Sequence, residues 1–224
     1  ERLKAKYKVD EIEVRQGESD LDEIWKMKGD FTPPGFRLKA VNKQDFRVVA
    51  KAFLSEEMEL FRMNNVNIEY REKSFVTDKK TGKTTIVYDI YVYGLRLERG
   101  GTNIGFAVDG RLSYVFAWLV PITPEMLNAA RCFEKEGITE DDVKRIVGEE
   151  ISSGLESLKI DLNKIHPEKM KEYKNVRVEG NYLTVKEPYV VWQATGLSTR
   201  FTIDGLSGKV IKRESTFIQD FPKR

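Results

Sequence analysis

The residues best suited to bind a nucleotide lie at 81–85, where Thr-Gly-Lys-Thr-Thr contains the Gly-Lys-Thr of a phosphate-binding loop. Such a loop also needs a glycine five residues before its second glycine, and a helix directly after it whose N-terminus faces the phosphates. Thr77 occupies the place of that first glycine, and the alternating apolar residues at 86–92 predict a strand. We therefore interpret the segment as the turn of a β-hairpin.

Side chains that commonly perform acid–base, nucleophilic or metal chemistry are few and scattered. One histidine, His166, and one cysteine, Cys132, cannot supply a zinc site or an intrachain disulfide. Cys132 lies in an apolar helical pattern, so we expect it to be buried. Asp109 and Asp204 each precede a glycine, where an aspartate stabilises a turn. The sequence therefore assigns no catalytic, cofactor-binding or metal-binding residue. A carboxylate-dependent hydrolase stays open as an alternative.

Aromatic side chains are concentrated in the predicted strands. Because side chains alternate along a strand, Tyr91 and Tyr93 lie on the sheet face opposite Tyr88 and Ile90. A sheet face that no helix covers is suited to binding another protein. We expect a partner-binding face that includes four aromatic residues: Tyr91, Tyr93, Trp118 and Trp192.

The composition is that of a globular protein with a nearly balanced surface charge. The 224 residues include 38 Lys and Arg and 36 Asp and Glu, so the net charge is +2 and no domain-scale basic field exists to bind nucleic acid. The charged fraction of 33% is typical of heat-adapted proteins. No apolar run approaches the length that crosses a bilayer.

Three segments follow from the pattern along the chain. Residues 1–40 are charged and are expected to form an arm or linker, with a short helix at 20–28. Residues 41–122 are expected to form a helix, capped by Asn42 and apolar on one face as far as Phe61, and then an antiparallel sheet. Residues 123–224 are expected to form a helical segment and a second antiparallel sheet. The expected fold class is α+β, with long amphipathic helices packed on antiparallel sheets.

The two halves share a short motif. Phe-Ala-Val-Asp-Gly at 106–110 corresponds to Phe-Thr-Ile-Asp-Gly at 201–205, and both follow an amphipathic helix and a hairpin strand. The repetition indicates either two related modules or merely the way a strand enters a tight turn, and the sequence leaves both open.

Three stretches resemble the PepSY module: Ile-Thr-Glu-Asp-Asp-Val at 138–143, Tyr-Val-Val-Trp at 189–192, and Phe-Thr-Ile-Asp-Gly-Leu-Ser-Gly-Lys-Val-Ile at 201–211. Residues 88–114 are similar to the companion module of thermolysin-type protease propeptides and of extracytoplasmic regulators of bacterial sensor kinases. The resemblance implies cystatin-like or PepSY-like modules that inhibit, chaperone or bind other proteins and do not catalyse. The His-Glu-x-x-His zinc helix of a protease precursor does not follow, so inhibition of a protease in cis is not implied.

The leading functional hypothesis is a non-catalytic protein-binding or regulatory domain without a cofactor. The resemblance implies a place outside the cytoplasm as part of an anchored protein. The chain opens on Glu1 without a methionine, so an anchor would be expected in a preceding segment. The alternative is a self-associating structural protein of a heat-adapted organism or mobile element. Light scattering discriminates between them, because only the second must form an oligomer.

Overall fold

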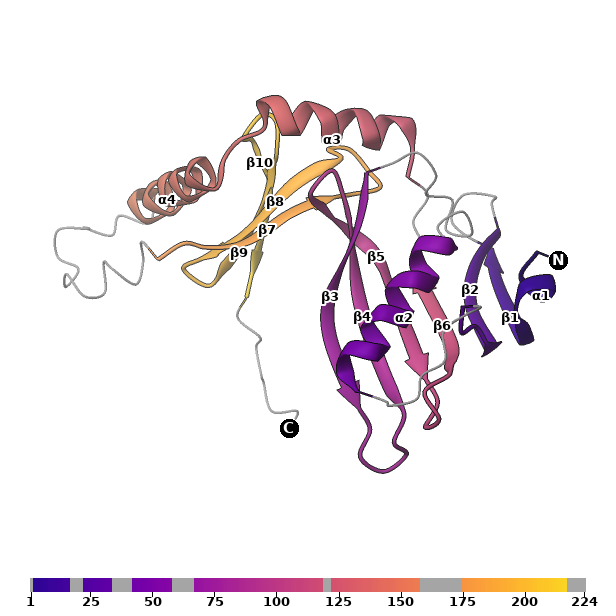
Figure 1. Cartoon of the computed structure of the whole chain (residues 1–224). Helices are drawn as coiled ribbons and strands as arrows, with labels where there is room; N and C mark the ends of the chain where they lie inside the picture. The colour runs from indigo at the N-terminus through magenta and orange to yellow at the C-terminus, as the bar shows by residue number, and fades with distance from the viewer. Residues whose placement is uncertain are drawn as a thin grey trace, which may run out of the picture. The chain divides into compact units, whose positions relative to one another are not determined.

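The computed structural model describes residues 2–16, 22–33, 42–57, 67–118, 122–157 and 175–216 (Figure 1). The chain divides into two compact units, Glu1–Thr123 and Pro124–Arg224, which we call unit 1 and unit 2. None of the helices in the described part of the chain is long and apolar enough to cross a membrane.

Unit 1 contains a six-stranded antiparallel sheet in which the first strands of the chain pair with the last strand of the unit. The strand order is β1 (Lys8–Gln16), β2 (Asp22–Asp30), β6 (Leu112–Trp118), β5 (Leu95–Phe106), β4 (Thr84–Val92) and β3 (Ile68–Thr77). Lys26, Met27 and Lys28 of β2 form the pairing with β6. The first two strands therefore belong to the same sheet as β3–β6, which are joined by hairpins.

The helix α2 (Lys43–Glu56) covers one face of this sheet (Figure 1). It begins where the sequence indicates, because the Asn42 side chain accepts hydrogen bonds from the amides of Gln44 and Asp45 at 2.8 and 3.1 Å. Its buried residue Phe46 contacts Phe106 of β5, with ring centroids 4.7 Å apart. Alternate residues of β4 are buried, and this pattern gives the sheet the apolar face that α2 covers.

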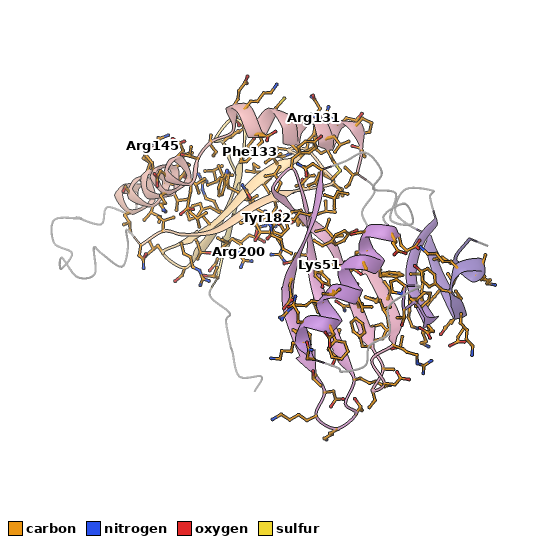
Figure 2. All side chains as sticks on the ribbon, in the orientation of Figure 1. Lys51, Arg131, Phe133, Arg145, Tyr182 and Arg200 are labelled. Atoms are coloured by element: carbon orange, nitrogen blue, oxygen red, sulfur yellow. The ribbon has the colours of Figure 1, made fainter. Side chains whose placement is uncertain are left out.

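Unit 2 places two helices against a four-stranded antiparallel sheet. The elements are α3 (Pro124–Glu136), α4 (Glu140–Ser157), β7 (Arg177–Leu183), β8 (Val190–Gly196), β9 (Thr199–Asp204) and β10 (Val210–Ser215), with the strands paired in chain order. Thr139 caps α4, because its hydroxyl accepts from the Asp142 amide at 3.2 Å while Asp142 accepts from the Thr139 amide. Phe133 of α3 adds to the core between the helices and the sheet (Figure 2).

The expected fold class is wrong, because sheet and not helix dominates the molecule. The described residues form ten strands and only four helices, of 5, 14, 13 and 18 residues, so the picture of long amphipathic helices packed on antiparallel sheets, as cystatin-like or PepSY-like modules, does not hold. Two misjudged segments account for much of the difference. The helix expected to reach Phe61 ends at Glu56, and Asp22–Asp30 is a strand where a short helix was expected at 20–28.

The expected arm at residues 1–40 also differs from what the structure shows. Its described part forms the helix α1 (Arg2–Lys6) and the hairpin of β1 and β2. Four of the charged residues that suggested a linker form cross-strand pairs in this hairpin, Lys28 with Glu11 at 2.6 Å and Lys26 with Glu13 at 3.0 Å. Cross-strand ion pairs of this kind are compatible with a sheet. A high density of charged residues therefore does not by itself distinguish a linker from a β-hairpin.

Candidate functional site

The segment with the sequence of a phosphate-binding loop is the turn between β3 and β4, as predicted. The Asp78 amide donates to the Lys83 carbonyl at 2.9 Å, and the Gly82 amide donates back to the Asp78 carbonyl at 2.8 Å. The Asp78 carboxylate accepts from the Lys80 amide and the Thr81 hydroxyl, both at 2.8 Å. These bonds hold the pKa of Asp78 below its ordinary value. The strand β4 follows directly, where a phosphate site would need a helix.

The two aspartates considered for catalysis both stabilise turns. Asp109 accepts from the Arg111 amide at 3.2 Å and from Arg111 Nε at 2.6 Å, and these bonds lower its pKa. Asp204 accepts from the amides of Leu206 and Ser207 at 2.8 and 3.2 Å. Both carboxylates are therefore occupied by local backbone donors.

The single histidine and cysteine add no site within the part of the chain that is described. Cys132 is exposed on α3, so the expectation of a buried cysteine is wrong. The buried residues of α3 are Met126 and Ala130, and Cys132 lies on a different side of the helix. His166 lies outside the described residues. Among the described residues, no three His, Cys, Asp or Glu side chains gather closely enough to hold a metal ion.

Of the four aromatic residues predicted to form a partner-binding face, the structure places Tyr91 on the side of the unit 1 sheet opposite α2. Tyr91 is half-buried there, with the Arg71 guanidinium 3.9 Å from the centre of its ring. Tyr93 lies in the turn after β4, with φ of 49°. Trp118 is the last residue of β6, and its side chain lies outside the described part.

Other side chains on this face are engaged with one another. The Tyr114 ring lies on Gly105, where a Cβ would come 1.7 Å from Tyr114 Cε1, and its hydroxyl is 2.8 Å from Thr85 Oγ1. Arg96 donates to Asp89 at 3.0 Å. The polar side chains on this face thus already bond to one another. A protein partner would therefore gain less binding free energy from contacts with them.

Trp192 does not belong to this face. It lies in unit 2 on β8, is 8% exposed, and forms part of the core under α4. Its ring centroid is 6.1 Å from that of Phe133. Its Nε1 has no hydrogen-bond acceptor among the residues that the structure describes. Trp192 therefore contributes to packing, because apolar side chains surround it on the inner face of the sheet.

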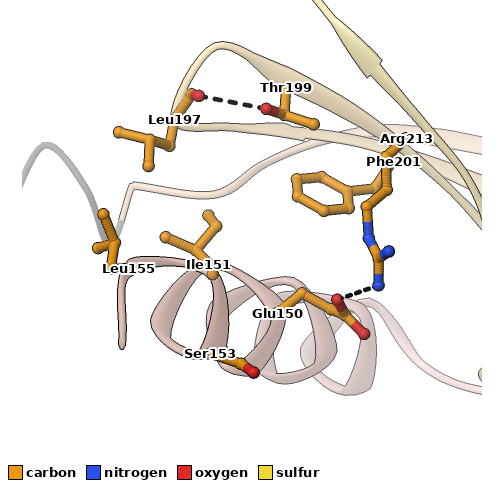
Figure 3. A pocket seen from close by; sticks show the side chains of 9 residues that line it. Glu150, Ile151, Ser153, Leu155, Leu197, Thr199, Phe201 and Arg213 are labelled. Carbon is orange, nitrogen blue, oxygen red and sulfur yellow. Dashed lines mark hydrogen bonds and ion pairs between the residues drawn. The ribbon is translucent and has the colours of Figure 1, made fainter. Parts of the chain in front are cut away.

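A groove of about 510 Å³ lies between the C-terminal half of α4 and the part of the sheet formed by the β8–β9 turn, β9 and β10 (Figure 3). Its apolar walls are formed by Ile151, Leu155, Leu197 and Phe201. Its polar residues are Glu150, Ser153, Thr199 and Arg213, and Arg213 donates a hydrogen bond to Glu150 across one end of the groove. The arrangement is an apolar floor with a polar rim.

Three local features shape the groove. The β8–β9 turn holds Leu197 and Ser198 at φ of 46° and 54°, and so directs Leu197 into the groove. Gly196 lets α4 approach, because a Cβ there would lie 2.8 Å from Ile151 Cδ1. Further along α4, a Cβ at Gly154 would meet no atom within 4 Å, so this glycine leaves one side of the groove open.

Sequence reasoning missed the groove. Nothing in the local sequence connects Ile151 and Leu155 of α4 with Leu197 or Arg213. The available clue was Gly154, a residue unfavourable inside a helix whose small size is useful only if something else needs the space.

Comparison with known proteins adds no assignment to this geometry, because no protein-family model matches the chain and no curated protein matches it significantly.

Proposed function

We propose that the chain is a non-catalytic protein-binding domain, and that the groove of unit 2 holds the apolar anchor of a protein partner. The observation that carries the proposal is the groove itself, about 510 Å³ in volume, which lies within the range of roughly 300–1,000 Å³ typical of ligand pockets.

The lining of the groove is better suited to binding an apolar side chain than to catalysing a reaction. A bulky apolar side chain gains about 1.5–3 kcal/mol when it leaves water for such a site. Interfaces typically combine an apolar centre with a polar rim that excludes water. Here Leu155 and Phe201 supply the centre, while Glu150 and Arg213 supply the rim. The partner is therefore a peptide segment that presents one or two bulky apolar side chains beside a charged or polar residue.

The test is a selection of peptides from a display library against the whole chain. We expect the selected peptides to share a bulky apolar residue, and its replacement by alanine to weaken binding about 10-fold to 100-fold, the equivalent of ~1.5–3 kcal/mol. In the protein, Gly154→Trp fills the groove and should abolish binding. Arg213→Glu places two carboxylates at the rim and should weaken it.

Gly148→Trp is the matched control, because Gly148 is on the same helix, meets no atom within 4 Å of its Cβ position, and does not line the groove. Circular dichroism shows whether each variant keeps its fold. Peptides that bind the wild-type chain and Gly154→Trp equally well would refute the proposal. A dimer seen by light scattering and dissociated by Gly154→Trp would instead identify a second copy as the occupant.

A further inference from the structure

The hairpin turns at one end of the unit 1 sheet form a tip that the groove does not involve. The tip comprises residues 76–84, which are the turn between β3 and β4 with the strand ends beside it, and residues 107–111, between β5 and β6 (Figure 1). The two turns lie against each other, because a Cβ at Gly82 would be 3.5 Å from Val108 Cγ2. The Ala107 amide donates to the Arg111 carbonyl at 2.9 Å, so the second turn is closed like the first. The tip is therefore one joined surface.

The tip carries three lysines that are open to solvent. Lys79, Lys80 and Lys83 are all exposed, and none forms an ion pair within 4 Å among the described residues. The acidic residues of the tip are occupied elsewhere: Asp78 accepts from its own turn, and Asp109 accepts from Arg111. Residues 78–83 thus carry three lysines against one aspartate, in a chain whose total charge is +2. The cations are left to face solvent.

Apolar side chains lie beside these cations. Val108 is 65% exposed and Val76 is 57% exposed, the two highest values among the large apolar residues that the structure describes. An exposed valine adds nothing to the stability of the fold, since such a side chain stabilises a protein by burying its apolar area. Lysines around an apolar point match the boundary of a membrane, where headgroups are charged and the layer beneath them is apolar.

We propose that this tip docks on the surface of a membrane that contains anionic lipids. Lys79, Lys80 and Lys83 lie among the anionic headgroups, and Val76 and Val108 enter the layer just below them. A nucleic acid offers the same negative charge, but its phosphate backbone has no apolar layer for the valines. The valines therefore favour the membrane.

The test is co-sedimentation of the full chain with vesicles of phosphatidylcholine, alone or mixed with phosphatidylserine. Binding is expected only with phosphatidylserine and should weaken as salt concentration rises. Each lysine near such a surface contributes a factor of about five, so Lys79→Glu/Lys80→Glu/Lys83→Glu should reduce binding by about 100-fold or more. Val108→Ser should reduce it by about 3-fold to 10-fold, with no change in the salt dependence.

The matched control is Lys135→Glu/Lys186→Glu/Lys209→Glu, which makes the same change in net charge at three exposed lysines of unit 2 and leaves every residue of the tip unchanged. It should retain most of the binding. Equal loss in both triple variants would show that only net charge matters and would overturn the proposal. So would binding to a short DNA duplex as tight as to the vesicles, or no binding of the wild-type chain to the mixed vesicles.

Discussion

Glu57, the C-cap residue of α2, has a buried carboxylate that would be unstable without hydrogen-bond donors. It is 1% exposed and accepts hydrogen bonds from Lys6 Nζ at 2.7 Å and from Tyr7 Oη at 2.8 Å. A buried charge is tolerated only when it is paired and hydrogen-bonded. Tyr7 also contacts Phe31 and Phe53, with ring centroids 5.8 and 5.9 Å away. The cluster thus fastens the first residues of the chain to α2.

Removing one hydroxyl should have opposite effects at two buried tyrosines. Tyr7→Phe takes a donor from the buried Glu57 carboxylate and should lower the free energy of unfolding by about 1.5–3 kcal/mol. Tyr88 is 1% exposed and its Oη has no partner among the described residues, so Tyr88→Phe should leave stability unchanged or raise it by up to ~1 kcal/mol. Urea denaturation measures both. Equal losses at the two positions would contradict this account.

The Tyr7 cluster should also make unit 1 sensitive to alkali. Burial, and then the hydrogen bond to Glu57, raise the pKa of Tyr7 from its ordinary value of 10 to about 12. Because the folded pKa is the higher one, the stabilisation is complete below pH 10 and is lost as pH rises toward 12. The stability difference between the wild-type chain and Tyr7→Phe should therefore shrink over this interval. Denaturation series at several pH values measure it, and a difference that grew with pH would contradict the prediction.

At the scale of elements, α4 combines a well-capped start with two glycines in its interior. Thr139 and Asp142 cap the helix, and its residues Val143, Val147 and Ile151 pack on the unit 2 sheet. Glycine inside a helix costs about 1 kcal/mol relative to alanine. At Gly154 the small side chain leaves the groove open, whereas Gly148 has no such role. Gly196 of β8 has a different role from the two helix glycines, because it lies directly under α4 and leaves room for Ile151.

Glycine-to-alanine changes should separate these roles. Gly148→Ala should raise the free energy of unfolding by about 0.5–1 kcal/mol, because its Cβ would meet no atom within 4 Å. Gly196→Ala should lower it by about 1–3 kcal/mol, because its Cβ would lie 2.8 Å from Ile151 Cδ1 and 3.3 Å from Val147 Cγ1. Thermal unfolding followed at a helical wavelength measures both. Stabilisation by Gly196→Ala would mean that α4 does not rest on β8.

At the scale of the molecule, the two proposals concern different units. The groove is formed by residues of unit 2 and the tip by residues of unit 1. Loss of peptide binding in Gly154→Trp and loss of vesicle binding in the lysine variant should therefore be separate effects. Either proposal can fail while the other stands. A chain with both properties would hold a partner protein close to a membrane surface.

The amino-acid sequence by itself determined the features that depend on neighbours a few residues apart. The Asn42 cap, the Thr139 cap and the turns at Asp78, Asp109 and Asp204 follow from side chains that reach their own backbone, so a short stretch contains the whole interaction. The alternation along β4 likewise indicated its buried face, because side chains of a strand point in turn to opposite sides.

Only the tertiary structure decided which of these pieces meet. The pairing of β2 with β6 joins Met27 to Val115, and the groove joins Glu150 to Arg213. The burial of Trp192, which placed it in a core instead of on a binding face, depends on α4 lying over β8. These contacts connect residues far apart in the chain, and a pattern of apolar and charged residues specifies that a face is buried but not what covers it.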